Sequence, residues 1–382
     1  RLFDTMKDSV EHHMIADVPV GAFLSGGIDS SIITTLMQEI RGDNPSSKAE
    51  HATGHRKIKT FTVGFDSLTE GKEAVETSSF LGTDHVEINI GPDEYFESLK
   101  KIVWHFDEPV ADPSAVGLYF LAKEASKSVK VVLSGEGSDD LFGGYNIYLA
   151  PIASRRMLWL PKSIIKMFLD LKFEYFGKNY LRRVNSKLED WYIGNASVFS
   201  RSEIDDLWKG KKEKLLSLGS LYKNVTDLSD STKMQYIDIN TWLIGDILAK
   251  ADKMTMANSL ELRVPFLDIW VAKVASTLSD KMKWRRGVTK YALREAFKKI
   301  IPETTRNRKK LGFPTPIRNW LTEDRKEVFD IILKNEYIKK HMNVKVIEIL
   351  INKHTSKAED NSRKIYLLLM LALWYNVFFK EK

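Results

Sequence analysis

The sequence predicts an α/β protein in which a parallel sheet is followed by a mostly helical part. Two observations lead to this class. Over residues 1–150, short runs rich in β-branched and aromatic residues alternate with stretches of helical periodicity, a pattern typical of a parallel sheet covered on both faces. From 151 to 382 the alternation stops, and long helical patterns rich in Leu, Ile, Met and Trp predominate. We therefore divide the chain into an α/β core, 1–150, and a mainly helical remainder, 151–382.

Each element of the first part can be placed from its local pattern. The expected strands lie at 20–24, 59–65, 85–90 and 130–133, and the expected helices at 30–40, 70–81, 93–104 and 114–126, several with Ser, Thr or Asp near the start. The segment 41–57 has no periodicity and is expected to be a surface loop. We interpret His51 and His55 within it as solvated side chains, because no helix would hold them at the spacing of a metal pair.

Composition excludes several classes of protein. The 382 residues, 43% of them hydrophobic, can bury a large core, and the absence of cysteine rules out disulfides, thiolate nucleophiles and Cys-based metal sites. No apolar run approaches the roughly 20 residues of a membrane span, so we expect a soluble, cytoplasmic protein. The net charge of +7 is spread along the chain, which argues against a nucleic-acid partner. The oligomeric state, a homodimer included, stays open.

A glycine-rich loop, Ser25-Gly26-Gly27-Ile28-Asp29-Ser30-Ser31, follows the first expected strand and opens a helix. Turn glycines let backbone N–H groups approach a polyanion, and the helix N-terminus and serine hydroxyls add donors. Asp29 would repel a bare phosphate unless a divalent cation lay between them, which favours a Mg-nucleotide. The chain has no Walker motif, and this loop resembles the pyrophosphate-binding loop of enzymes that split ATP between its α and β phosphates. The alternative is a serine N-cap on an ordinary turn.

A second glycine-rich loop, 134–145, follows the fourth expected strand and carries Glu136, Asp139 and Asp140. Open α/β sheets bind ligands at this carboxyl end of their strands. Carboxylates this close repel one another unless they share a cation or a proton, so we expect Asp29 and Asp139 to lie on opposite sides of one magnesium ion. Taken alone, the loop is equally well explained as a turn whose side chains cap the next helix.

The two loops, with 61–65 (FTVGF) between them, resemble the synthetase domain of glutamine-dependent asparagine synthetases. The stretch 248–268 (LAKADKMTMANSLELRVPFLD) is similar to the long central motif of that family, and 290–294 (KYALR) and 310–314 (KLGFP) are similar to two later motifs. The resemblance covers about 6–320. It implies a sheet of the PP-loop ATP pyrophosphatase type, also described as adenine nucleotide alpha hydrolase-like.

The resemblance also implies a reaction and a set of site residues. The enzyme would adenylate the side-chain carboxylate of aspartate with Mg-ATP, release pyrophosphate and let ammonia attack the acyl-adenylate. Glu136 would orient ammonia and accept its proton, while Lys290 would neutralise the charge that builds on the α-phosphate. Asp29 and Asp139 would hold Mg²⁺. The residues implied to bind ATP are Leu24, Ser25, Gly26, Gly27, Asp29, Ser30, Ser31, Val63, Ser134 and Gly135.

The sequence departs from the family pattern in two places. Family members carry an N-terminal glutaminase domain that begins with a nucleophilic cysteine, and this domain is absent from the sequence. The opening at Arg1 reads as the middle of a helix, so we expect that an upstream part, the source of ammonia, is missing. Where well-known asparagine synthetases place an arginine and a threonine for aspartate, the segment 107–115 is rich in proline and acidic residues.

Two alternatives therefore stay open. One is a β-lactam synthetase-like ligase, or another amidotransferase of the same fold, that acts on a different carboxylate. The other comes from a different class, a non-catalytic nucleotide-binding module to which Glu136 would be dispensable.

Several residues in the central motif, and Asp246 just before it, are interpreted as structural. Asp246, Lys250 and Lys253 share a helix face by their spacing, and we expect them to form a charge ladder. Arg263 is left open between a buried ion pair and a substrate contact. The side chains expected in the core are Met254, Met256 and Leu260.

Overall fold

The computed structural model describes residues 1–42, 57–65, 70–155, 162–169, 181, 183–184, 186–210, 218–308, 315–322 and 324–380. Two sequence predictions lie outside these residues. They are the surface loop with His51 and His55, of which only the ends are described, and the motif 310–314.

The centre of the fold is a five-stranded parallel sheet with the strand order β3-β2-β1-β4-β5. The strands are β1 (Val20–Phe23), β2 (Lys59–Phe65), β3 (Asp84–Ile90), β4 (Val131–Leu133) and β5 (Glu261–Arg263). The four strands that the sequence predicts are all present, and the α/β class is confirmed. The fifth strand was not predicted. It comes from the second part of the chain and pairs with β4, with Val132 opposite Leu262.

The four helices that the sequence predicts are present, and their observed bounds differ from the expected ones by at most two residues. The helices up to the second glycine-rich loop are α1 (Leu2–His13), α2 (Ile28–Arg41), α3 (Glu70–Leu81), α4 (Pro92–Phe106), α5 (Ser114–Ala125) and α6 (Ser138–Phe142). The next are η1 (Asn146–Leu149), α7 (Ala150–Arg155), α8 (Lys162–Leu169), α10 (Leu188–Trp191), α11 (Arg201–Leu207), α12 (Gly219–Lys223) and α13 (Asp230–Asn240). A π-helical segment, η2 (Leu243–Leu248), then leads into α14 (Ala249–Met256).

The last third of the chain is helical apart from β5. Its elements are η3 (Pro265–Leu267), α15 (Ile269–Ser276), α16 (Asp280–Lys283), α17 (Tyr291–Ala296), α18 (Glu303–Asn307), α19 (Ile317–Trp320), α20 (Lys326–Leu333), α21 (Glu336–His341), α22 (Val344–Thr355), α23 (Ser362–Tyr375) and η4 (Asn376–Lys380). None of the described helices is both long and apolar enough to cross a bilayer.

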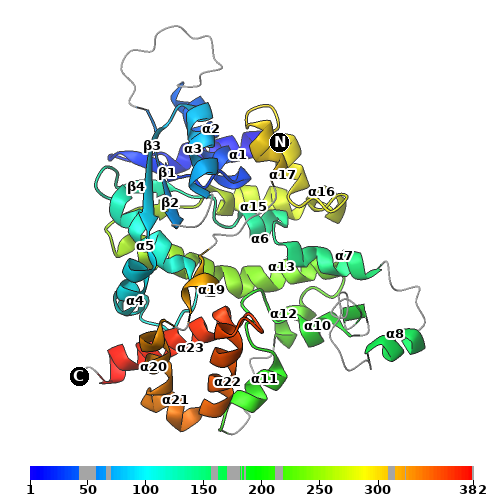
Figure 1. Ribbon diagram of the computed structural model, residues 1–382. Helices are drawn as coiled ribbons and strands as arrows, with labels where there is room; N and C mark the ends of the chain where they lie inside the picture. The colour runs from blue at the N-terminus through cyan, green and yellow to red at the C-terminus, as the bar shows by residue number, and fades with distance from the viewer. Residues whose placement is uncertain are drawn as a thin grey trace.

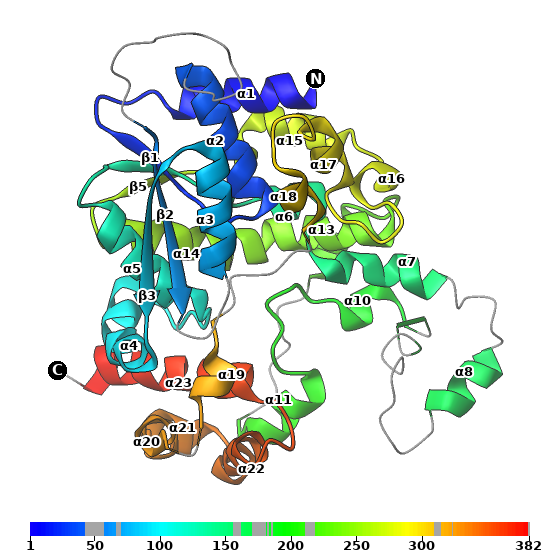
Figure 2. The same ribbon diagram turned by 45° about the horizontal axis from the view of Figure 1, so that its top comes forward.

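The sheet separates two hydrophobic cores, because successive side chains of a strand point to opposite faces. On β4, Val131 and Leu133 belong to one core and Val132 to the other. The first core is completed by α1, α2, α15 and α17, and the second by α4, α5, α14 and the C-terminal helices. The layers can be followed in Figures 1 and 2, where α20–α23 lie at the opposite end of the molecule from α1.

A third, smaller core supports the second glycine-rich loop. It is built from Tyr148, Tyr192, Tyr222 and Trp284. The Trp284 indole N–H donates to the Gly143 carbonyl at 2.9 Å, and the Gln235 amide donates to the Asp140 carbonyl at 2.7 Å. These bonds hold the middle and the C-terminal end of α6, so the loop that carries the acidic residues is fixed by the helical part of the chain.

The central motif is structural in part. Met254 and Leu260 are fully buried, as expected, but Met256 is 54% exposed, so its placement in the core was wrong. The ion pair considered for Arg263 is present but is not buried, because its Nε lies 2.8 Å from Oε1 of Glu261, whose side chain is 56% exposed. Its guanidinium donates to the carbonyls of His13 and Ile15 and so ties β5 to the chain that follows α1.

Candidate active site

The candidate site lies where the strand order reverses, which is the usual ligand position in an open α/β sheet. From β1 the chain proceeds outward to β2 and β3, and then returns to the other side of β1 to form β4 and β5. The loops that follow β1 and β4 therefore leave the sheet side by side. They border a cavity of about 660 Å³, whose other walls come from α5, α14, α17, α19 and α23.

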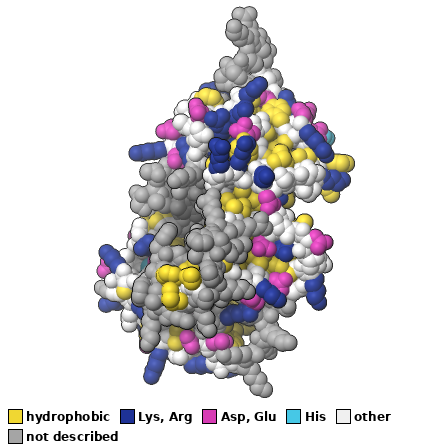
Figure 3. All heavy atoms as spheres, turned by 90° about the vertical axis from the view of Figure 1, so that its right-hand side faces the viewer, with side chains coloured by type: hydrophobic (Ala, Val, Ile, Leu, Met, Phe, Trp, Pro, Cys, Tyr) yellow, Lys and Arg dark blue, Asp and Glu magenta, His cyan; other side chains and the backbone are white. Residues whose placement is uncertain are grey.

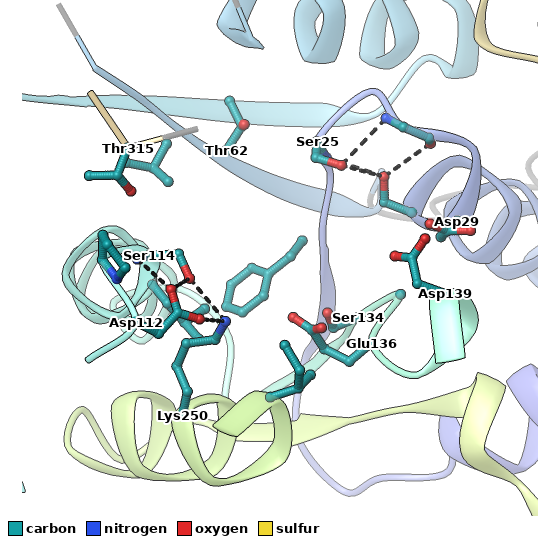
Figure 4. Close-up of a pocket in the computed structure, with 18 of the residues that line it drawn as sticks. Ser25, Asp29, Thr62, Asp112, Ser114, Ser134, Glu136, Asp139, Lys250 and Thr315 are labelled. Carbon is teal, nitrogen blue, oxygen red and sulfur yellow. Dashed lines mark hydrogen bonds and ion pairs between the residues drawn. The ribbon is translucent and has the colours of Figure 1, made fainter. Parts of the chain in front are cut away.

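Hydrogen bonds within the first loop fix its shape. Gly27 is the N-cap of α2, and its carbonyl accepts from the Ser31 hydroxyl at 2.7 Å. The Ser25 hydroxyl, labelled in Figure 4, lies 3.2 Å from the Ser30 hydroxyl. Gly26 has φ +70°, and a Cβ there would lie 2.6 Å from the backbone of Glu73. A side chain at this position would be both strained and blocked, which explains the glycine.

Most of the predicted ATP-binding residues line the cavity. These are Leu24, Ser25, Gly27, Asp29, Ser30, Val63, Ser134 and Gly135, together with Glu136, Asp139 and Lys290. Gly26 and Ser31 are not among the lining residues. Gly26 contributes the turn, and the Ser31 hydroxyl is used within the first turn of α2.

Two carboxylates from different loops meet at one buried ammonium. The Nζ of Lys290 lies 2.6 Å from Asp29 Oδ2 and 2.7 Å from Asp139 Oδ1, and its side chain is only 2% exposed. The Ser138 hydroxyl donates to the other oxygen of Asp29 at 2.7 Å. We call these four residues the Asp29 group. The loops approach so closely because Gly135 has no side chain, since a Cβ there would lie 2.8 Å from the Cβ of Asp29.

The acidic residues next to this group have separate environments. Glu136 lies between the Asp29 group and Lys250 in Figure 4, and it lines the cavity. Asp140 is not among the residues that line the cavity, and it is 1% exposed. Burial, together with the charge of Asp139, raises the pKa of Asp140 to about 7. Asp139 is therefore the second carboxylate of the site, and Asp140 belongs to the support behind it.

The Asp29 group has the chemistry of a magnesium site. Magnesium is bound in proteins by one or two carboxylates completed by water and substrate phosphates. Asp29 and Asp139 supply two carboxylates within reach of one point, and this point is already occupied by a cation, the Lys290 ammonium. Within the described residues, no cluster of three or more His, Cys, Asp or Glu side chains could hold a metal by itself. The donor set therefore fits an ion that arrives with a phosphate ligand.

A second charged group faces the same cavity from the opposite side. Lys250 Nζ lies 2.6 Å from Asp112 Oδ2 and donates to the Ser114 hydroxyl at 2.9 Å. The Ser114 hydroxyl in turn donates to Asp112 Oδ1 at 2.8 Å. We call these three residues the Asp112 group, and Figure 4 shows it across the cavity from Asp29 and Asp139. Although burial opposes it, the Asp112 carboxylate raises the pKa of Lys250 above its ordinary value.

The position of Lys250 differs from the ladder that the sequence predicts. Its ammonium pairs with Asp112, 138 positions away, and Lys253 donates to the carbonyl of Phe106. Burial and the nearby charge of Asp112 raise the pKa of Asp246 to about 7. The π-helical segment η2 lies immediately before α14 and turns Ile247 into the cavity wall with Lys250. Periodicity alone misses such a site, because it assumes a regular helix.

The amino-acid sequence was compared with protein families and with known proteins. A sequence model of the protein family described as "Asparagine synthase" matches residues 1–376. The chain belongs to the asparagine synthase family. It is 45% identical to asparagine synthetase [glutamine-hydrolyzing] 1 of Bacillus subtilis and 42% identical to a putative asparagine synthetase [glutamine-hydrolyzing] of Mycobacterium tuberculosis, in each case over 98% of this chain. A more distant relative, asparagine synthetase B of Escherichia coli, is 31% identical over 38% of it.

The comparisons also show how much of each relative this chain covers and how much of this chain the family model covers. The chain spans 58% of the Bacillus subtilis relative and 57% of the Mycobacterium tuberculosis one. The family match also reaches further than the motifs at 6–320, and it includes α23. Ser362 and Arg363 at the start of α23 line the cavity, so the C-terminal helices contribute to the site as well as to the core.

Proposed function

We propose that this chain is the synthetase part of an AMP-forming ligase that converts aspartate and ammonia to asparagine. The observation that carries the proposal is the convergence of Asp29, Asp139 and Lys290 from three separate segments on one point of the cavity. A site that only binds adenosine does not require such a concentration of buried charge, whereas the cleavage of a metal-bound nucleotide does.

The nucleotide would occupy the side of the cavity next to the two glycine-rich loops. Backbone groups of Leu24, Val63 and Gly135 would contact the adenosine, and Ser25, Gly27 and Ser30 would donate to the phosphates. All six residues line the cavity. Asp29 and Asp139 would hold Mg²⁺, which supplies neutralisation of the phosphate charge. We call this side the phosphate end of the cavity.

The first chemical step would be attack of the substrate carboxylate oxygen on the α-phosphorus. A new P–O bond forms, and the bond between the α-phosphorus and the leaving pyrophosphate breaks. Lys290 would stabilise the negative charge that develops on the α-phosphate, an interaction that is stronger in the transition state than in the ground state. Its burial at 2% exposure removes competing water.

The second step would be attack of the ammonia nitrogen on the acyl carbon, which breaks the C–O bond to AMP. The attacking nitrogen must lose a proton as the amide forms, and a carboxylate within reach accepts it. We assign this role to Glu136, and the assignment is supported by its position in the cavity lining between the Asp29 group and the Asp112 group (Figure 4).

The Asp112 group would form the acid end of the cavity, where the amino acid lies. It offers an ammonium, a carboxylate and a hydroxyl, and Arg363 lines the same cavity. Where well-known members of the family place an arginine and a threonine, the segment 107–115 supplies Asp112 and Ser114, so the acceptor acid is the least constrained part of the proposal. Ammonia would come from solution or from a glutaminase part of the kind that the names of the relatives indicate.

The test is pyrophosphate exchange into ATP with Mg²⁺ and a panel of carboxylic acids, followed by product analysis with ammonia. We expect aspartate-dependent exchange and equal amounts of AMP and asparagine. Formation of ADP would contradict the proposal, and exchange with a different acid would favour the β-lactam synthetase-like alternative. Glu136→Gln serves as the internal control: exchange should persist while asparagine formation falls roughly 100-fold or more. A variant with unchanged turnover would instead favour the nucleotide-binding module.

A further inference from the structure

Arg308 contacts the first glycine-rich loop although no motif assigns it a role. It follows α18, and its guanidinium donates to the Gly26 carbonyl at 2.5 Å. Its Nε lies 3.3 Å from Oε1 of Glu73 on α3, and the side chain is 16% exposed. Both Arg308 and Glu73 line the cavity. A cation and an anion are thus paired at the edge of the loop where phosphates are proposed to bind.

Two other cations near the glycine-rich loop, Lys290 and Arg294, already bind groups of the protein. The Lys290 ammonium is shared by two carboxylates, so this group has no excess of positive charge. Arg294 directs its guanidinium at backbone carbonyls, with Nε 2.8 Å from Thr289 O and a second nitrogen 3.2 Å from Arg308 O. A nucleotide brings several negative charges, and it needs more compensation than Lys290 and one divalent ion provide. Arg308 is the described cation that contacts the loop backbone.

Arg294 fixes the position of the backbone at Arg308. Its guanidinium also donates to the carbonyl of Arg306, so it bonds the backbone on both sides of Asn307. Arg294 is 9% exposed, and burial lowers its pKa from the ordinary value. Because the backbone at 306–308 is fixed from within the protein, the Arg308 side chain is presented to the glycine-rich loop at low entropic cost.

We propose that Arg308 binds the terminal phosphates of the nucleotide and the pyrophosphate that leaves, and that Glu73 competes with these phosphates for it. This inference rests on the proposed function, because it places phosphate at the glycine-rich loop. The guanidinium has five N–H donors in a planar fork that suits phosphate oxygens. When phosphate is absent, the charge of Arg308 is balanced by the Glu73 carboxylate, and when phosphate is bound, it is balanced by a phosphate oxygen. Glu73 then limits the affinity for pyrophosphate and so favours its release.

The alternative is that Arg308 and Glu73 are only a structural bridge between the chain after α18 and α3. The two explanations predict different signs. For a structural bridge, loss of either partner disturbs the loop, and both variants bind phosphate more weakly or without change. For competition, loss of Arg308 weakens binding and loss of Glu73 strengthens it.

The experiment is titration of the full chain with pyrophosphate in the presence of Mg²⁺, by calorimetry. We expect Arg308→Gln to weaken pyrophosphate binding roughly 10-fold or more, since a hydrogen bond to a charged group is lost. Arg308→Lys should lose less, and Glu73→Gln should bind roughly 3-fold or more tightly, because phosphate no longer competes with a carboxylate. Glu76→Gln is the matched control. Glu76 lies 3.8 Å from Arg308 but is 71% exposed, and its variant should bind as the wild type does.

The outcomes separate the inference from the proposed function. Unfolding temperatures of all four variants identify any that is misfolded, and Arg308→Lys keeps the comparison informative if Arg308→Gln fails to fold. Weaker binding by Glu73→Gln, or unchanged binding by both Arg308 variants, would overturn the inference. Absence of pyrophosphate binding to the wild type would overturn it too. If the wild type binds pyrophosphate but exchanges it with no acid, the proposed function fails while the role of Arg308 stands.

Discussion

The two ends of the cavity use a buried lysine in different ways. In the Asp29 group one ammonium is shared by two carboxylates, whereas in the Asp112 group one ammonium faces one carboxylate. The first group has an excess of negative charge that an added cation can balance. The second is neutral without any ligand. The difference teaches that buried lysines of similar exposure can stand in groups of different net charge, one of which could accept a further cation while the other is balanced by itself.

The largest expected effect is the loss of one charge from the balanced group. Lys250→Met leaves Asp112 buried without its partner, which should lower the free energy of unfolding by about 3–5 kcal/mol. The double variant Asp112→Asn, Lys250→Met removes both charges and should recover most of that loss. Denaturant unfolding of the two variants measures the difference. Equal stability of the single and double variants would show that the pair is not balanced in the way described.

The Asp29 group should respond differently to the same substitution. Lys290→Met should lower kcat/KM about 10²- to 10³-fold, as is typical when one donor to a developing charge is removed. It also leaves two carboxylates that a divalent ion can bridge, so Mg²⁺ should raise the unfolding temperature of this variant more than that of the wild type. Lys250→Met should show no such rescue. The same magnesium response in both variants would remove the distinction between the ends.

Two serines offer a smaller and closely matched test. Ser138 donates to Asp29 at 2.7 Å, and Ser114 donates to Asp112 at 2.8 Å. Ser138→Ala removes one hydrogen bond to a carboxylate, a loss of about 1.5–3 kcal/mol. Ser114→Ala removes a bond of the same kind together with the one that its hydroxyl accepts from Lys250. Ser138→Ala should raise the KM for Mg-ATP without changing the KM for the acid. Ser114→Ala should raise the KM for the acid without changing the KM for Mg-ATP. Steady-state kinetics with each substrate varied in turn would decide, and a common effect on both KM values would count against separate ends.

The smallest effect concerns Asp246 beside the Asp112 group. Its pKa rises from the usual 3.8 to about 7, so the folded chain binds more protons than the unfolded chain between these pH values. The free energy of unfolding therefore falls as pH increases across this range. In Asp246→Asn the free energy of unfolding should therefore fall less between these pH values. The difference from the wild type should be about 1 kcal/mol or less, because solvent screens a half-buried group. Unfolding at pH 4 and at pH 8 measures it, and parallel curves for variant and wild type would contradict it.

Local pattern was sufficient for most of the sheet. Strands β1, β2, β3 and β4 were expected within a residue or so of their bounds, since each is a β-rich run bounded by turn residues. Strand β5 was missed because Glu261–Arg263 is only three residues long and carries a charge at each end. Such a segment becomes a strand through its pairing with β4, which local sequence does not encode.

The candidate site was predictable on one side only. Glycine-rich loops carry their own signal, so Asp29, Glu136 and Asp139 were named from the sequence, and Lys290 followed from the family resemblance. Lys250 was interpreted only as part of a charge ladder and Arg308 was not singled out, because their partners are far away in the chain. Asp112 did carry a local sign, since it caps the backbone of Ser114 at 2.9 Å at the start of α5. An Asp-Pro-Ser turn indicates a helix start, but it does not reveal a buried lysine opposite.

The backbone N–H of Ser134 donates to the carbonyl of Arg263 at 2.9 Å, so the ends of β4 and β5 are joined directly. The chain that intervenes departs from the sheet and returns beside its own point of departure. Such a detour can be exchanged as a module. A chimera that takes residues 146–258 from a relative would keep both glycine-rich loops, Asp112, Ser114 and Lys290, and it would exchange Trp242, Ile247 and Lys250 in the cavity wall. Such a chimera would show whether this segment influences which acid is accepted.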